Sequence, residues 1–172
     1  MKEGGFFIKR IGGAILFLLF LLLTGCSNNS VEEALKDKLF HLDVLLEQKT
    51  ELGYAVFYKT KKPEMAYGAR LLEKEGMNWK VSLGSEIQPI QDEKDLVWGW
   101  QSDNNIVFVY GVIKNPKIEQ VTINGNDASV QSIKGDYNVF FLVTDKSFEI
   151  DEDITKIEVK GLSKDGAILY YD

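Results

Sequence analysis

The chain has 172 residues, enough for one domain or two small ones, and its hydrophobic content of 45% is ordinary for a folded protein, which excludes general disorder. Its 20 basic and 26 acidic residues form no basic patch, which argues against nucleic acid as a partner. The single cysteine excludes an intramolecular disulfide.

The first 25 residues have the pattern of a secretion signal. Lys2, Lys9 and Arg10 precede an uncharged apolar run of thirteen residues from Ile11 to Leu23. A helix of this length spans only about 20 Å, whereas the hydrocarbon core of a membrane is roughly 30 Å thick. We therefore expect a cleaved signal peptide at residues 1–25 rather than a permanent transmembrane helix.

The leader ends at the cysteine. The residues Leu23-Thr24-Gly25-Cys26 resemble the lipobox of bacterial lipoprotein signal peptides. The resemblance implies cleavage between Gly25 and Cys26 and transfer of a diacylglyceryl group to the Cys26 sulfur, whose thiolate is the nucleophile. Two or three acyl chains, palmitate among them, would hold the protein on the extracytoplasmic face of the cell membrane, since one chain alone binds reversibly. The alternatives are an ordinary signal peptide with a chance cysteine, or an uncleaved anchor.

The mature chain is acidic and begins with a short tether. The leader carries three basic residues and one acidic residue, so its removal leaves 17 basic and 25 acidic residues and a net charge of −8. This charge disfavours both nucleic acid and anionic lipid as partners. Residues 26–30 form a short polar tether, so the folded part should lie close to the bilayer. Ser27 is not the aspartate of the familiar inner-membrane retention signal, which favours a Gram-positive cell.

An amphipathic helix is predicted next, over residues 31–48. Ser30-Val31-Glu32-Glu33 has the form of a capping box. Apolar residues then recur at spacings of three and four, the period of one helix face, at Val31, Leu35, Leu39, Leu42 and Leu46.

The pattern changes to alternation at Tyr54. Strands are expected at 54–60, 65–74 and 79–83, joined by turns, as an antiparallel meander that buries the leucines of the helix. Segment 84–95 is irregular and is the expected boundary. The predicted architecture is therefore α+β, with a helix and meander at 31–95 and a second unit at 96–172.

The second unit is predicted to be a β-sandwich. Seven short strands separated by turn residues are expected, and Asn124-Gly125 is a strong hairpin signal. The predicted strands are 96–102, 106–113, 118–123, 128–133, 137–144, 154–162 and 167–171. Neighbouring aromatic residues should point to opposite faces of their strands, outward or into a second layer; these pairs are Phe57-Tyr58, Phe140-Phe141 and Tyr170-Tyr171.

Part of this unit resembles bacterial immunoglobulin-like domains. The resemblance covers about 65 residues, from Val109 to Tyr171, and rests on five short runs. They are Val109-Tyr-Gly-Val-Ile113, Ile118-Glu-Gln-Val-Thr-Ile-Asn-Gly125, Phe140-Phe-Leu-Val143, Ile154-Thr-Lys-Ile-Glu-Val-Lys-Gly161 and Asp165-Gly166. The chain departs from the family at Gly161, where alanine is usual. The family implies a binding or spacer module and no particular chemistry.

Catalytic and metal-binding patterns are weak. His41 is the only histidine, so it could serve a single Ser-His-Asp arrangement or one ligand position, and we interpret it as an ordinary helix residue. The runs Asp103-Asn104-Asn105 and Asp151-Glu152-Asp153 offer oxygen ligands for calcium but lack the spacing of a known calcium loop. We predict no catalytic residue, no metal and no cofactor.

Trp98 and Trp100 are the remaining candidates for a binding site. They lie two residues apart on a strand, so they share one face, where two indoles could form a platform for a sugar or a peptide. Packing in the core is the alternative for both. The sequence thus predicts a lipid-anchored, non-enzymatic protein that acts by binding or protein interaction at the cell envelope, with an envelope protein or a glycan as the partner. A lipoprotein that binds sugar or cell-wall fragments, and a wall hydrolase that uses paired carboxylates, are the alternatives.

Overall fold

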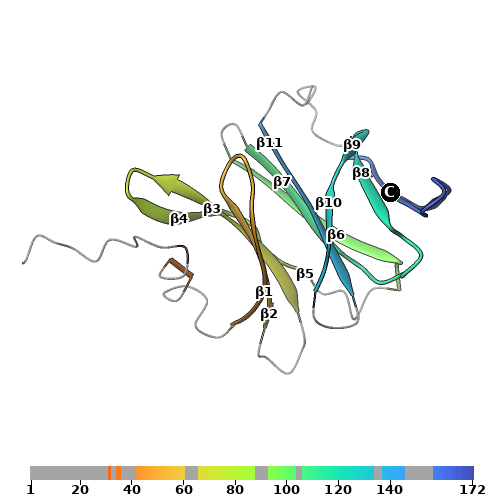
Figure 1. Ribbon diagram of the computed structural model, residues 1–172, viewed down its shortest axis with the longest axis horizontal. Coiled ribbons are helices and arrows are strands. Elements are labelled where there is room, and N and C mark those ends of the chain that lie inside the picture. The colour runs from red at the N-terminus through yellow and green to blue at the C-terminus, as the bar shows by residue number, and fades with distance from the viewer. Residues whose placement is uncertain are drawn as a thin grey trace, which may run out of the picture.

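A computed structural model shows three antiparallel β-sheets, A, B and C, that pack in layers with sheet B in the middle (Figure 1). It describes Val31, Ala34 and Leu35, and then residues 42–60, 66–87, 93–103, 106–133, 137–145 and 157–172. No helix in these ranges is long and apolar enough to cross a membrane.

The first sheet, sheet A, is the predicted meander with two additional strands, one at its edge and one paired with its middle strand. It has the order β1-β2-β3-β4, and the short strand β5 also pairs with β3. The five strands are β1 (Leu42–Lys49), β2 (Tyr54–Thr60), β3 (Tyr67–Glu75), β4 (Asn78–Leu83) and β5 (Glu86–Ile87). The β3–β4 hairpin extends beyond the other strands at the left of Figure 1.

The other two sheets form the predicted sandwich. Sheet B has the order β10-β11-β7-β6 and sheet C the order β13-β12-β8-β9. Their strands are β6 (Leu96–Asp103), β7 (Ile106–Ile113), β8 (Gln120–Ile123), β9 (Asn126–Asp127), β10 (Ser129–Ser132), β11 (Asn138–Asp145), β12 (Val159–Leu162) and β13 (Ile168–Tyr171). The turn between β8 and β9 has positive φ at both Asn124 (48°) and Gly125 (78°), as a tight hairpin turn requires.

Three apolar clusters hold the layers together. Between sheets A and B the buried side chains include Phe57, Leu71, Phe108, Tyr110 and Phe141. Between sheets B and C they include Leu96, Val109, Ile118, Val121 and Phe140. The outer face of sheet A, turned away from sheet B, carries Val56, Tyr58 and Leu72, which pack against Ala34 and Leu35.

Sheet B is therefore buried on both faces. Neighbouring aromatics serve both layers, because successive side chains of a strand point to opposite faces. Phe140 packs towards sheet C and Phe141 towards sheet A. In sheet A, Phe57 faces sheet B and Tyr58 faces outward, under Val31, Ala34 and Leu35. The first cluster draws on residues from both sides of segment 84–95; the division there into two units stays a prediction.

The predicted helix is wrong over residues 42–48, which belong to strand β1. The pairing of β1 with β2 contains a bulge at Leu45, between the pairs Val44↔Tyr58 and Leu46↔Phe57. This extra residue reverses the alternation, so Leu42 packs on the outer face and Leu45 and Leu46 pack towards sheet B. Leucines whose spacing fits one helix face thus serve two faces of a sheet.

The described part of the chain is accordingly built from antiparallel strands, and the predicted α+β class is not supported there. At Val31, Ala34 and Leu35 the backbone is helical, but residues 32–33 and 36–41 lie outside the described residues. The signal peptide, Gly25, Cys26, the tether and His41 also lie outside them, as do Asn104, Asn105 and residues 151–153.

Candidate functional site

The two candidate tryptophans lie on β6, the edge strand of sheet B, and both face sheet C. Trp98 is half-buried and packs against the core between sheets B and C, whereas Trp100 is 37% exposed. The Trp98 indole N–H donates a hydrogen bond to Oδ2 of Asp172 at 3.2 Å. Trp98 therefore supports the edge of the sandwich, and of the two indoles Trp100 is the one more open to a ligand.

Asp172 joins the edges of the two sheets. Besides Trp98, its Oδ2 atom accepts a hydrogen bond from the Tyr170 hydroxyl at 2.8 Å and lies 3.1 Å from Nζ of Lys94. The hydrogen bond from Tyr170, followed by that from Lys94, lowers the pKa of Asp172. Burial, together with the bond to Asp172, raises the pKa of Tyr170. A charged carboxylate at neutral pH thus fixes β13 beside β6.

Strand β13 carries an exposed apolar surface, which we call the β13 surface: Ile168, Leu169 and Tyr171. Their exposed fractions are 58%, 37% and 64%. The only other exposed large hydrophobic residues in the described part of the chain are Val44, Met77 and Trp100, each on a different strand or turn. The sequence predicts that one ring of the pair Tyr170-Tyr171 faces outward or into a second layer, but it does not single out Ile168 and Leu169.

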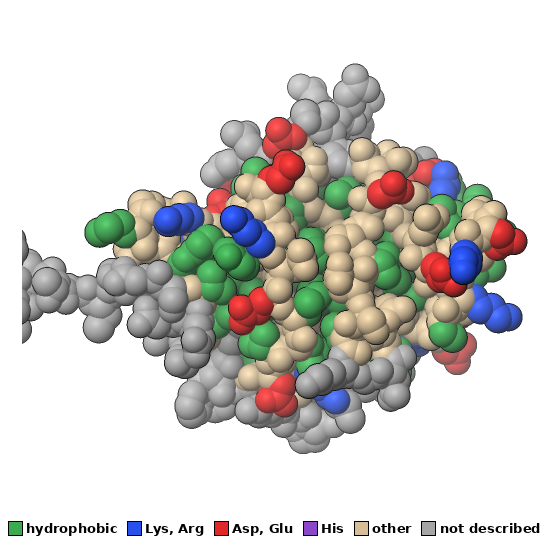
Figure 2. Space-filling model, viewed as in Figure 1, with side chains coloured by type: hydrophobic (Ala, Val, Ile, Leu, Met, Phe, Trp, Pro, Cys, Tyr) green, Lys and Arg blue, Asp and Glu red, His purple; other side chains and the backbone are tan. Residues whose placement is uncertain are grey.

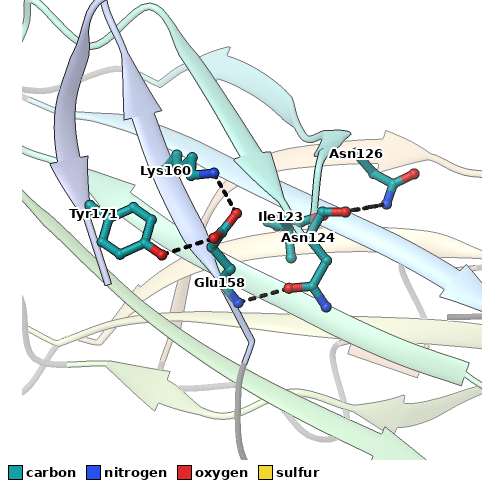
Figure 3. A network of polar contacts seen from close by, with 6 residues as sticks. All are labelled: Ile123, Asn124, Asn126, Glu158, Lys160 and Tyr171. Carbon is teal, nitrogen blue, oxygen red and sulfur yellow. Dashed lines mark hydrogen bonds and ion pairs between the residues drawn. The ribbon is translucent and has the colours of Figure 1, made fainter. Parts of the chain in front are cut away.

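The orientation of Tyr171 is fixed by a network of polar contacts (Figure 3). Its hydroxyl donates to Oε2 of Glu158 at 2.9 Å, and Nζ of Lys160 lies 2.6 Å from Oε1 of the same carboxylate. Lys160 also lies over the Tyr171 ring, 5.4 Å from its centre. These contacts lower the pKa of Glu158, chiefly through Lys160, and raise the pKa of Tyr171 through Glu158. The ring is therefore exposed but held in one position.

The same network anchors the β8–β9 turn. Asn124 donates its backbone N–H to the Glu158 carbonyl at 2.9 Å. Its side-chain Oδ1 accepts the Glu158 N–H at 2.8 Å (Figure 3). Asn126 donates from Nδ2 to the carbonyl oxygens of Ile123 and Asn124. The turn predicted from Asn124-Gly125 thus binds the start of β12, whose neighbouring Glu158 accepts the hydrogen bond from Tyr171.

A second candidate site is a groove of about 380 Å³ between sheets A and B. Its walls are the turn after β1 and the last part of β11, with Glu51, Asp127 and Asp145 as its acidic residues. The hydrolase alternative would draw its carboxylates from this set. Within the described ranges, no group of three or more Asp, Glu, His or Cys side chains is arranged to hold a metal ion.

Comparison with known proteins gives no further assignment: no family model matches the chain, and no curated protein or solved structure is significantly similar to it.

Proposed function

We propose that this chain is a lipid-anchored, extracytoplasmic and non-enzymatic protein that binds another envelope protein through the β13 surface. The lipobox at residues 23–26 supports the anchor, with Cys26 as the lipidated residue. Support for a binding module of the bacterial immunoglobulin-like type comes from the packing of sheets B and C and from the β8–β9 hairpin within the resembling segment.

The observation that carries the proposal is the composition of β13 as an edge strand. Natural edge strands are usually guarded by charged residues, proline, bulges or short length. Strand β1, the edge of sheet A, follows this rule with a bulge and exposed Asp43, Glu47 and Lys49. By contrast, β13 is short and irregular in its pairing but contains only large apolar and aromatic residues.

The backbone of β13 is also suited to strand addition. Asp172 and Val159 exchange both of their backbone hydrogen bonds, at 3.0 Å each. Because bonding directions alternate along an antiparallel strand, the N–H and C=O of Tyr171 point away from β12. An extended segment of a partner could pair with these groups while its side chains contact Ile168 and Tyr171.

Photocrosslinking in living cells tests this proposal. A photoreactive amino acid at position 168 should yield a specific adduct with one envelope protein, and the same probe at Val44, an exposed position on the edge strand β1, should not. Ile168→Lys should then weaken binding of the purified partner by at least about tenfold, as for a hot-spot residue, whereas Val44→Lys should not. Equal crosslinking from both positions, or none from position 168, would overturn the proposal.

A glycan-binding lipoprotein is the second candidate, favoured by the exposure of Trp100, which is 37% exposed on the edge strand β6. A sugar ring stacked on Trp100 should change the tryptophan fluorescence on titration with cell-wall fragments. This response should be lost in Trp100→Ala and kept in Trp79→Phe, since Trp79 packs edge-on against Tyr54 on the far side of the molecule. A flat titration with every glycan tested would remove this candidate.

A further inference from the structure

We infer that the β3–β4 hairpin contacts the lipid bilayer and that the outer face of sheet A is turned towards the membrane; this inference rests on the proposed lipid anchor at Cys26. The partner is an anionic lipid surface. Three observations support it: the length of the tether, the exposed tip of the hairpin and the distribution of charge over its two faces.

The tether limits how far sheet A can lie from the bilayer. Five peptide units separate Cys26 from Val31, and a fully extended chain of five residues spans at most about 18 Å. Val31 packs in the cluster on the outer face of sheet A, together with Tyr54, Trp79 and Val81. An acylated Cys26 therefore holds Val31 within about that distance of the membrane, and with it the part of this face against which Val31 packs.

The tip of the hairpin is hydrophobic and unusually exposed. Met77 lies in the turn between β3 and β4, beside Gly76 with φ of +64°, and it is 81% exposed, the largest value among the exposed hydrophobic residues described. A hydrophobic side chain stands at the end of the projecting hairpin in Figure 2, with basic side chains behind it. Methionine is flexible and apolar, and such a tip can enter the headgroup region at little cost.

Charge is divided between the two faces of the hairpin. Residues paired across an antiparallel ladder share a face, so Lys74 lies with Trp79, and Leu72 with Val81, on the outer face. Arg70 is on this face as well, with its guanidinium 5.7 Å from the centre of the Tyr58 ring. The opposite face carries Glu73, Glu75 and Lys80, of which Glu75 and Lys80 lie 3.8 Å apart.

The outer face of the hairpin is thus basic and aromatic, although the mature chain as a whole is acidic. Basic residues near an anionic membrane surface are attracted to it, and tryptophan favours the interface. The acidic residues that share this face of sheet A, Glu47 and Glu86, pair with Val56 and Gly68, away from the tip of the hairpin.

The same orientation places the β13 surface away from the membrane. Stacked sheets lie about 10 Å apart, so sheet C is roughly 20 Å farther from the bilayer than sheet A. The surface that we propose for a protein partner therefore stays accessible while the hairpin contacts lipid.

A fluorescent probe at the hairpin tip tests the inference on the full, lipidated protein. Cys26 is the only native cysteine and its sulfur is used by the lipid, so Met77→Cys provides a unique thiol for an environment-sensitive dye. In phosphatidylglycerol–phosphatidylcholine vesicles, the dye at position 77 should shift to the blue and be quenched by spin-labelled lipid. The matched control, Ile168→Cys, lies in sheet C and should show neither effect.

Charge-reversing variants separate electrostatic contact from simple proximity. Lys74→Glu should reduce quenching at position 77, whereas Lys164→Glu, which makes the same charge change beside sheet C, should not. A water-like signal at position 77 in protein that floats with the vesicles, or equal quenching at positions 77 and 168, would overturn the inference and leave the anchor intact. Protein that does not float would overturn the anchor, and the inference with it.

Discussion

Replacing Gly111 by alanine should destabilise the sandwich, because no side chain fits at this position. Gly111 lies on β7 between Trp98 of β6 and Phe140 of β11, in the middle of sheet B. A Cβ atom there would lie 2.4 Å from Cε1 of Phe140 and 2.5 Å from the carbonyl oxygen of Val97. Phe140 is fully buried and the Val97 oxygen belongs to the backbone, so neither can move away freely.

Overpacking of this kind costs about 1–3 kcal/mol. Gly99, on the neighbouring strand β6, provides a matched control, since a Cβ atom there would be 3.4 Å from Cγ2 of Ile87 and 3.6 Å from the Tyr110 hydroxyl, which are ordinary contacts. Gly99→Ala should therefore stabilise the protein by up to about 1 kcal/mol through the lower entropy of the unfolded chain. The two substitutions should therefore change the free energy of unfolding in opposite directions.

Urea denaturation of a soluble form that begins at Ser30, followed by tryptophan fluorescence, measures both effects. Phe140→Leu removes the part of the ring that would clash and should cost less in the Gly111→Ala background than alone, which gives a measurable coupling energy. The Val97 oxygen remains, so rescue should be incomplete. A Gly111→Ala protein within about 0.5 kcal/mol of the native one would refute this reading of the packing.

Four further results are expected. Tyr58→Phe should stabilise the protein by about 1 kcal/mol, because the buried Tyr58 hydroxyl has no hydrogen-bond partner in the described structure; a loss of stability on denaturation would contradict this. Because the pKa of Asp172 is lowered in the folded protein, its contribution to folding stability is complete above the ordinary pKa of 3.8 and is lost as the pH falls through the folded pKa. The NMR signal of the Trp98 indole N–H should shift in that acid range, and the shift should be absent in Asp172→Asn. Cys26→Ala should abolish acylation by mass spectrometry, and unchanged membrane retention would instead indicate an uncleaved anchor. The soluble form from Ser30 should sediment as a monomer; a dimer broken by Ile168→Lys would show that β13 pairs with a second copy.

Most strands could be predicted from the sequence because local signals agree with the fold. Strand β2 (Tyr54–Thr60) and strand β7 (Ile106–Ile113) have the predicted bounds, and both begin after turn residues and consist mainly of β-branched and aromatic side chains. The turn at Asn124 was predictable because asparagine and glycine tolerate positive φ. In each case the signal lies within a few residues and needs no knowledge of the partner strand.

Strand β1 could not be predicted in this way. Its leucines satisfy a helix pattern, and the sequence does not reveal that a bulge at Leu45 divides them between two apolar layers. The strand is favoured by its pairing with β2, the next strand along the chain, and by the packing of its leucines into both layers. The sequence left open whether Tyr171 faces outward and did not single out Ile168 and Leu169 for a related reason, since exposure depends on which strand ends a sheet, and strand order is not a local property.

For the two candidate tryptophans, the sequence predicts the shared face of the strand but not the environment of each side chain. Alternation correctly places Trp98 and Trp100 on one face, but their environments differ because Asp172, the residue that follows β13, binds the indole of Trp98 and contacts no atom of Trp100 in the hydrogen bonds described. Two indoles with the same orientation therefore have different roles: one supports the sandwich and the other remains open.

The position of sheet B explains how one small protein can present two separate surfaces. A two-layer sandwich of sheets B and C alone would leave the apolar face with Phe108, Tyr110 and Phe141 in water. Sheet A covers that face, and its own outer face is covered in turn by Ala34 and Leu35, which lie a few residues after the tether. With Cys26 lipidated as proposed, the segment next to the anchor would be part of the fold, because Val31, Ala34 and Leu35 pack in this cluster. In the proposed arrangement, the anchor at Cys26 and the hairpin would be coupled through one apolar cluster, while β13 lies two sheets away, where a partner could approach without contacting lipid.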